Sequence, residues 1–236
     1  GSDALLLVDT ISALASIEMR MDDWGVDVIV GGSQKGLMLP PGLAFNGVSP
    51  KALAAHETAT LPRAYWDWSD MLGPNAKGVF PYTPATNMLY GLVEAVAMLE
   101  EEGLDAVFAR HDRHAEATRR AVRAWGLEIW CEEDRHHSSS LTAVTMPEGH
   151  SGDALRAVIL ENFDMSLGAG LSKLADRIVR IGHLGDFNDL MLMGTLSGVE
   201  MGLALAGVPH DKGGADAAMA YLTETAPQKS GAKTAA

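Results

Sequence analysis

The 236-residue chain has one cysteine, few basic residues and no long apolar run. A single thiol, Cys131, cannot form an internal disulfide, which is typical of a reducing compartment. With 18 Lys and Arg against 31 Asp and Glu, the formal net charge of −13 argues against a nucleic-acid partner, because such binding depends on clustered cations. No stretch of about eighteen uncharged apolar residues occurs, so we expect no membrane partner.

Signals for export and for metal binding are also missing. No positively charged and then apolar leader opens the chain, and we therefore expect a cytoplasmic protein. The histidines of "DRHHSSS" do not have the spacing of metal ligands, so the sequence predicts no metal site.

What the sequence does contain is a set of short apolar runs, "ALLLVD" (4–9) and "VDVIV" (26–30), bounded by polar residues or glycine. This pattern is typical of strands that are covered on both faces in a parallel sheet. A third strand is predicted by "GLAFNGVS" (42–49), and a helix by "PKALAAHETA", with Pro50 at its first position. The pattern predicts an α/β domain over residues 1–103.

A change of pattern follows this domain. The segment "TPATNMLYGLVEAVAMLEEEG" predicts a helix with Thr83 as its N-cap and Gly103 as its stop. A further helix over 104–126 is expected to connect to a small α+β domain over 127–222, where short strands alternate with helices. Residues 223–236 are small and polar, and we expect them to be disordered.

Two polar side chains follow the first two predicted strands. Asp9 ends the first strand, and Lys35 stands in the turn "GGSQKG" after the second. Ligands collect at the carboxyl ends of strands in an open α/β sheet, so both groups would face one crevice. A lysine beside apolar surface is more easily neutral, and a neutral amine can form a Schiff base with an aldehyde. The spacing equally allows Lys35 to be a solvated loop lysine and Asp9 to be a helix N-cap.

Two further residues have both a structural and a functional interpretation. Thr83 lies where a helix is predicted to begin, and the unpaired N–H groups of a helix N-terminus can hold a phosphate. A simple helix cap explains Thr83 equally well. Arg180 interrupts the apolar strand of "RIVRIGHLG", so it should lie on a sheet edge or meet a carboxylate in a two-bonded fork.

Four motifs occur in a fixed order between Leu5 and Val208: "LLLVDTISALASI", "GVDVIVGGSQKGLMLPPGL", "FPYTPATNMLYGL" and "RIVRIGHLGDFNDLMLMGTLSGVEMGLALAGV". Together they resemble the class V branch of the fold-type I pyridoxal phosphate (PLP) enzymes, specifically the serine–glyoxylate and alanine–glyoxylate aminotransferases. The resemblance implies an α/β fold: part of the large PLP-binding domain, a mostly parallel sheet with helices, then a smaller C-terminal α+β domain. It also implies a homodimer, and a chain that is the C-terminal portion of such an enzyme.

The resemblance assigns a role to each candidate. Lys35 matches the lysine that holds PLP, and Asp9 matches the carboxylate that pairs with the pyridine nitrogen. Gln34 matches a contact of the cofactor phosphate, and Thr83 matches a phosphate ligand that comes from the neighbouring subunit. Arg180 matches the arginine that binds the substrate α-carboxylate.

The implied reaction is transamination between a small amino acid, with serine preferred, and glyoxylate, giving glycine and a 2-oxo acid. Aspartate or alanine as the donor stays open, as does a truncated, inactive, dimerising remnant. Cysteine desulfuration is less favoured, because those enzymes usually have His where Gln34 precedes Lys35. One departure concerns the phosphate site: Phe80 stands where the family often has a tyrosine, a contact that is lost unless Tyr82 replaces it.

Overall fold

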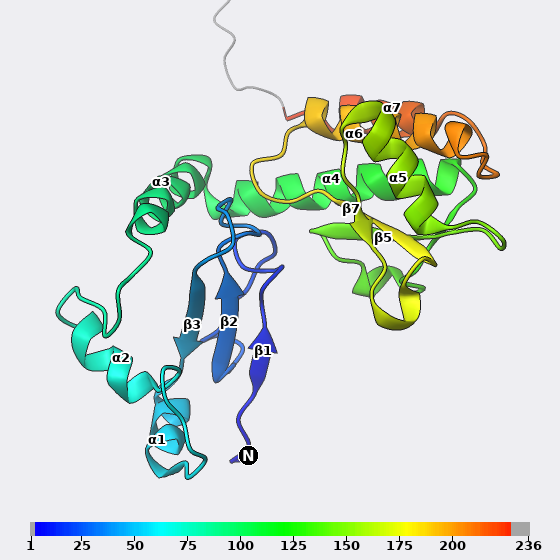
Figure 1. Cartoon of the computed structure of the whole chain (residues 1–236). Coiled ribbons are helices and arrows are strands. Elements are labelled where there is room, and N and C mark those ends of the chain that lie inside the picture. The colour runs from blue at the N-terminus through cyan, green and yellow to red at the C-terminus, as the bar shows by residue number, and fades with distance from the viewer. Residues whose placement is uncertain (1–2, 228–236) are drawn as a thin grey trace, which may run out of the picture. The chain divides into compact units, whose positions relative to one another are not determined.

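The computed structural model describes residues 3–227, and the chain divides into two compact units, Gly1–Asp105 and Ala106–Ala236 (Figure 1). The domains expected over 1–103 and 127–222 fall in different units. Their assignment as the PLP-binding domain and the small domain stays a prediction. Among residues 3–227, no helix combines the length and apolarity needed to cross a membrane.

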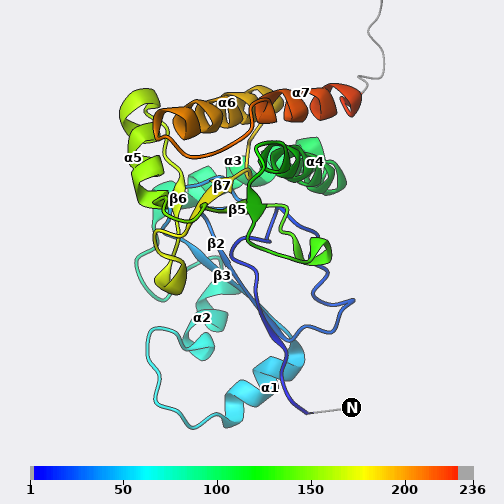
Figure 2. The ribbon, with the colours of Figure 1, turned by 90° about the vertical axis from the view of Figure 1, so that its right-hand side faces the viewer.

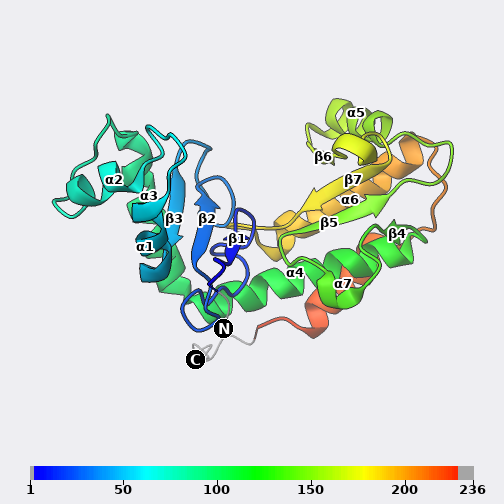
Figure 3. The ribbon, with the colours of Figure 1, turned by 90° about the horizontal axis from the view of Figure 1, so that it is seen from below.

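The first unit contains a three-stranded sheet with β2 in the middle (Figure 3). Its strands are β1 (Leu7–Asp9), β2 (Val28–Gly32) and β3 (Ala44–Val48), at the positions that the apolar runs predict. β1 and β2 are parallel, whereas β3 runs antiparallel to β2. The short connection 33–43 contains no helix, and a parallel return needs a crossover of roughly a dozen residues or more.

Burial of the first strand differs from the expectation. Leu7 is 64% exposed and Leu6, just before β1, is 50% exposed, so β1 is not covered on both faces in the part of the chain that the structure describes. β2 is closer to the prediction: Val28 is only 4% exposed, and Ile29 and Val30 are partly buried. The difference arises because β1 is the edge of this sheet and β2 is its centre.

Three helices follow the sheet: α1 (Pro50–Thr58), α2 (Trp68–Asn75) and α3 (Thr86–Glu102). α1 begins at Pro50 as expected, and α2 was not anticipated. The expected start of α3 is wrong. Ala85, not Thr83, is its N-cap, because the Thr86 amide donates to the Pro84 carbonyl at 2.9 Å and forms a tight turn before the helix. Gly103 ends α3 with φ +83°, as the sequence predicts.

The second unit is an antiparallel sheet with helices gathered over one face (Figures 1 and 2). The strand order is β4-β5-β7-β6. The strands are β4 (Glu128–Ile129), β5 (Leu141–Thr145), β6 (Gly168–Ala169) and β7 (Ile178–Gly182), and the helices are α4 (Leu104–Ala124), α5 (Gly152–Phe163), α6 (Asp189–Leu205) and α7 (Gly214–Glu224). Two short 3₁₀ helices cover Asp134–His136 and Ser172–Leu174.

Two domain boundaries that the sequence predicts differ from those of the structure in this unit. The helix expected over 104–126 is α4, and from Ala106 onward it belongs to the second unit, where Ala117, Ala121 and Val122 enter the core. Thr223 and Glu224 are helical, since they end α7, and therefore do not belong to a disordered tail. Residues 228–236 lie outside the described part of the chain.

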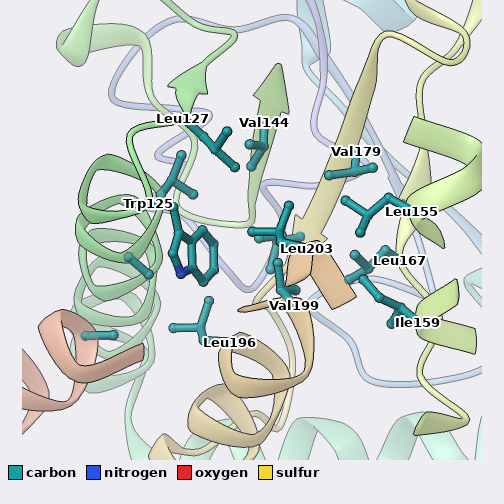
Figure 4. Packing of buried hydrophobic residues seen from close by; sticks show 14 of the residues in the cluster. Trp125, Leu127, Val144, Leu155, Ile159, Leu167, Val179, Leu196, Val199 and Leu203 are labelled. Carbon is teal, nitrogen blue, oxygen red and sulfur yellow. The ribbon is translucent and has the colours of Figure 1, made fainter. Parts of the chain in front are cut away.

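The core of the second unit is apolar and includes Trp125, whose ring packs at one side of the cluster (Figure 4). Its indole N–H donates to Glu200 Oε2 at 3.0 Å. The same carboxylate accepts the backbone N–H groups of Gly213 and Ala215, at 2.6 and 2.8 Å, at the start of α7. One half-buried carboxylate thus connects Trp125 at the end of α4 with α6 and α7, and it satisfies donors that would otherwise be unpaired at a helix N-terminus.

Candidate active site

Asp9 and Lys35 lie at the same end of the first sheet, as the sequence predicts. Asp9 is the last residue of β1 and is paired in register with Val30 of the parallel strand β2, and Lys35 follows in the turn after β2. Asp9 Oδ1 accepts the Ile11 N–H at 2.9 Å. Residues 11–17 form turns, so Asp9 caps a turn and is not a helix N-cap. Its Oδ2 has no hydrogen-bond partner among residues 3–227.

Lys35 is half-buried, and its Nζ has neither a hydrogen bond nor an ion pair with any described residue. Its backbone is held in place, because the Lys35 carbonyl accepts the Met38 N–H at 2.9 Å. The neighbouring Gln34 is exposed. The amine is therefore held on an ordered turn without a partner of its own, and this is the state that a group awaiting a ligand would have.

Ser33 holds the lysine-bearing loop closed, a role that the sequence analysis missed. Its hydroxyl is fully buried, donates to the Pro40 carbonyl at 2.7 Å and accepts the Leu43 N–H at 3.1 Å. A serine in a loop that also contains glycine and proline is the signal that could have indicated such a side chain to backbone bond.

Thr83 is exposed and precedes α3 by three residues, so local geometry does not place it at the N-terminus of that helix. Phe80 and Tyr82 are also exposed, at 49% and 45%. The Tyr82 ring lies 4.9 Å from the ring of Tyr65. A phosphate role for Thr83 consequently rests on the sequence motif.

Arg180 lies on β7, between β5 and β6, which excludes an edge position, one of the two alternatives that the sequence leaves open. Its Nε donates to the Ala169 carbonyl at 2.8 Å. Gly168 stands opposite it, where a Cβ would come within 3.0 Å of Arg180 Cβ, so the small residue makes room for the arginine. Within residues 3–227 no carboxylate pairs with this guanidinium, and its two terminal nitrogens have no partner. They are available for a ligand.

Comparison with known proteins decides the family. The Aminotransferase class-V family matches residues 1–181. The chain belongs to the class-V aminotransferases. The L-aspartate–glyoxylate aminotransferase of Paracoccus denitrificans is 44% identical over 223 residues, which are 94% of this chain and 56% of that protein. The serine–glyoxylate aminotransferase of Methylorubrum extorquens is 45% identical over 230 residues, 95% of this chain and 57% of that protein.

The fold agrees with this family. The crystal structure of ureidoglycine–glyoxylate aminotransferase from Bacillus subtilis matches with a TM-score of 0.85 and 30% identity, over 94% of this chain and 58% of that one. The expected fold class, α/β of fold-type I, is confirmed. The chain spans little more than half the length of the relatives that it matches.

The residues of this class-V aminotransferase that are present fit PLP in two respects. An amine without a partner and a carboxylate with one free oxygen stand at the ends of adjacent parallel strands. An amine is the group that binds an aldehyde, and a carboxylate is the group that pairs with a protonated ring nitrogen. No three His, Cys, Asp or Glu side chains of the described residues are grouped so that they could hold a metal ion.

The loop after the strand of Arg180 is held by side chains of α4. Arg110 donates to the carbonyls of Gly185 and Phe187 at 2.8 and 3.1 Å. His111 Nδ1 bonds to the Val107 carbonyl at 2.7 Å, so its Nε2 accepts the Gly185 N–H at 3.1 Å. Sequence reasoning did not find these residues, because their partners are backbone atoms far away in the chain.

In this class-V aminotransferase, two other residues of α4, Arg113 and His114, bind Asp189 at the start of α6. Asp189 receives a two-bonded fork from Arg113, at 2.6 and 2.8 Å, and a bond from His114 Nε2 at 2.9 Å. The Arg113 hydrogen bonds hold the pKa of the Asp189 carboxyl below its usual value. Burial lowers the pKa of His114. Asp189 is thus kept charged and His114 neutral.

His183 follows β7 and is fully buried. Its Nδ1–H donates to the Ser139 carbonyl at 3.1 Å, and its Nε2 accepts the Thr142 hydroxyl at 3.0 Å. Burial lowers its pKa from 6.5 to about 3. The side chain is therefore neutral in the folded protein throughout the physiological range.

We expect His183 to make the stability of this class-V aminotransferase depend on pH. Between pH 6.5 and 3 the unfolded chain binds a proton at His183 that the folded chain does not, so stability falls as pH falls. Between pH 8 and pH 5, His183 alone should lower the free energy of unfolding by about 2 kcal/mol. The measurement is urea unfolding at pH 8 and at pH 5. On acidification, His183→Gln should lose about 2 kcal/mol less unfolding free energy than the wild type.

The matched control is His136→Gln, on a histidine whose side chain is 58% exposed. This variant should keep the wild-type pH dependence. If His183→Gln loses as much stability as the wild type on acidification, the role assigned to His183 is wrong.

Proposed function

We propose that the protein is a PLP-dependent aminotransferase that passes the amino group of a small amino acid, serine preferred, to glyoxylate, giving glycine and a 2-oxo acid. The observation that carries the proposal is the position of Asp9 and Lys35 at the ends of adjacent parallel strands, with no partner on the lysine amine. Relatives named for serine–glyoxylate and aspartate–glyoxylate transamination support glyoxylate as the acceptor.

Each residue of the site has a defined task in this proposal. Bound PLP supplies an electrophilic carbonyl carbon and a ring that accepts electrons from the substrate Cα. Lys35 would hold PLP through its amine, and the same amine, when free, would accept the proton that leaves the substrate Cα. Asp9 keeps the ring nitrogen protonated, and Gln34 and Thr83 contact the phosphate. These assignments follow the sequence motifs and the free amine and carboxylate.

Arg180 binds the substrate α-carboxylate in this proposal. A guanidinium can bind a carboxylate through two parallel hydrogen bonds, and its planar shape fixes the orientation of the Cα–H bond that breaks. The support is the unpartnered pair of terminal nitrogens on an interior strand. Thr83 serves the neighbouring subunit, so the proposal includes a homodimer, and it places the enzyme in the cytoplasm.

The donor is tested by spectroscopy on the full-length protein purified with PLP. We expect L-serine to remove the visible absorption of the lysine-bound cofactor and glyoxylate to restore it. Aspartate is the second candidate donor, favoured by the 44% identical Paracoccus relative. A cycle that proceeds with L-aspartate or L-alanine but not with L-serine would contradict the serine preference.

Glyoxylate and the remnant alternative are tested in the same way. Failure of glyoxylate to restore the absorption after any of the three donors would reject glyoxylate as the acceptor. The 236-residue chain by itself, if it folds without ever developing the visible absorption, would favour the truncated, inactive remnant.

A further inference from the structure

We propose that the turn Leu14–Ser16 is a clamp that positions Lys35 relative to Asp9, an inference that rests on the role proposed for Lys35. The turn follows the strand that ends in Asp9, and it packs against Gly36, the next residue after Lys35. A Cβ added at Gly36 would lie 2.2 Å from the Leu14 carbonyl oxygen and 2.5 Å from the Ser16 hydroxyl. Real Cβ atoms essentially never approach other atoms within 3.0 Å, so the turn and the lysine-bearing loop leave no room for a side chain at position 36.

Both sides of this contact are anchored to the sheet. On the clamp side, the Thr10 amide and hydroxyl both donate to the Val30 carbonyl of β2, at 2.9 and 2.7 Å, and the Leu14 amide donates to the Thr10 carbonyl at 2.9 Å. On the lysine side, the Ser33 hydroxyl closes the loop through the bonds described above. The contact at Gly36 therefore joins two fixed segments.

The clamp has two features that reduce stability. Ala15 has φ +60°, a left-handed conformation that disfavours residues other than glycine. The Ser16 hydroxyl is fully buried and has no hydrogen-bond partner among residues 3–227. Met38, in the lysine-bearing loop, has φ +60° as well. Unfavourable conformations of this kind cluster where the surrounding structure must hold a functional group in place.

The geometry predicts how far Lys35 would move if the contact were disturbed. A methyl group at Gly36 would lie 2.2 Å from the Leu14 carbonyl oxygen and must withdraw by more than 1 Å to reach an ordinary contact of 3.4–4 Å, and Lys35 would move with it. A misplacement of roughly 1 Å reduces the rate of a positioned reaction on the order of 100-fold.

The test follows PLP binding to the full-length protein after the cofactor has been removed. The rate at which the visible absorption returns and the pH midpoint of that absorption are measured, and borohydride reduction with peptide mapping locates the modified lysine. In Gly36→Ala we expect the rate to fall on the order of 100-fold and the pH midpoint to shift. A wild-type rate and midpoint in Gly36→Ala would overturn the clamp.

Gly47→Ala is the matched control. Its Cβ would lie 2.7 Å from Ile29 Cγ1 and 2.9 Å from Met21 Sδ, so it creates a similar clash in the same unit, against side chains instead of the backbone of the clamp. We expect it to lower stability and to leave the rate and pH midpoint of PLP binding unchanged. If Gly47→Ala shifts the midpoint as Gly36→Ala does, the effect is general destabilisation and the clamp is rejected.

Ser16→Ala tests the clamp even if Gly36→Ala does not fold. Removal of an unpartnered buried hydroxyl should leave stability equal or higher, yet, because this hydroxyl is part of the contact with Gly36, it should slow PLP binding and shift its pH midpoint in the same direction as Gly36→Ala does. A stable Ser16→Ala protein with wild-type rate and midpoint would overturn the clamp. Wild-type protein with the cofactor on a lysine other than Lys35 would instead overturn the proposed function, and the clamp with it.

Discussion

Lys35→Ala abolishes transamination in the full-length protein: we expect turnover to fall by about 10⁴-fold or more, because both the attachment of the cofactor and the movement of the Cα proton are lost. No other described lysine stands in the turn after β2. The measurement is the serine-dependent loss of the visible absorption and the rate of glycine formation. Borohydride should no longer attach the cofactor to the chain.

The control for this variant is Lys77→Ala, on an exposed lysine that follows α2. It should transaminate at the wild-type rate. Lys35→Ala should also unfold at nearly the wild-type urea concentration, since the Lys35 amine has no partner among the described residues. Glycine formation at the wild-type rate in Lys35→Ala would refute the proposed role.

Arg180→Ala weakens the apparent affinity for both the amino acid and the oxo acid. Loss of a two-bonded, charge-assisted contact costs on the order of 2–4 kcal/mol, which corresponds to roughly a 30- to 900-fold weaker affinity. Both substrates are affected because both carry an α-carboxylate. Steady-state kinetics with each substrate varied in turn provide the measurement.

Two variants separate recognition of the carboxylate from effects on the fold. Arg180→Lys keeps the positive charge but not the fork, so it should recover only part of the affinity. Arg177→Ala removes an exposed arginine just before the same strand, 5.7 Å from the ring of Trp130, and should leave affinity unchanged. Unchanged affinity for both substrates in Arg180→Ala would exclude its assigned role.

Local patterns predicted most of the elements. The apolar runs located β1, β2 and β3, and the proline and glycine signals located the start of α1 and the end of α3. These signals succeed because they act within a few residues of chain. The strand β6 was not anticipated. It is only two residues long, like β4, and so short a strand has no periodicity to detect.

The errors have a common cause, which is dependence on distant parts of the chain. The sequence could not show that β7 has β6 on its outer side, so an edge position for Arg180 stayed open beside a carboxylate partner. Likewise the turn at Pro84 moves the start of α3 beyond Thr83, although the residues fit a helix cap. Buried His111 and His183 have hydrogen-bond partners on backbone atoms that only the folded chain brings near.

The sequence by itself determined the order of the strands along the chain, the position of a lysine and a carboxylate after two of them, and the motifs of the class-V aminotransferases. Those features are local, because they depend on residue type and short spacing. Only the tertiary structure decided that the Lys35 amine has no partner, that Arg180 is interior, and that the turn Leu14–Ser16 presses on Gly36. These are contacts between distant segments, and packing alone sets them.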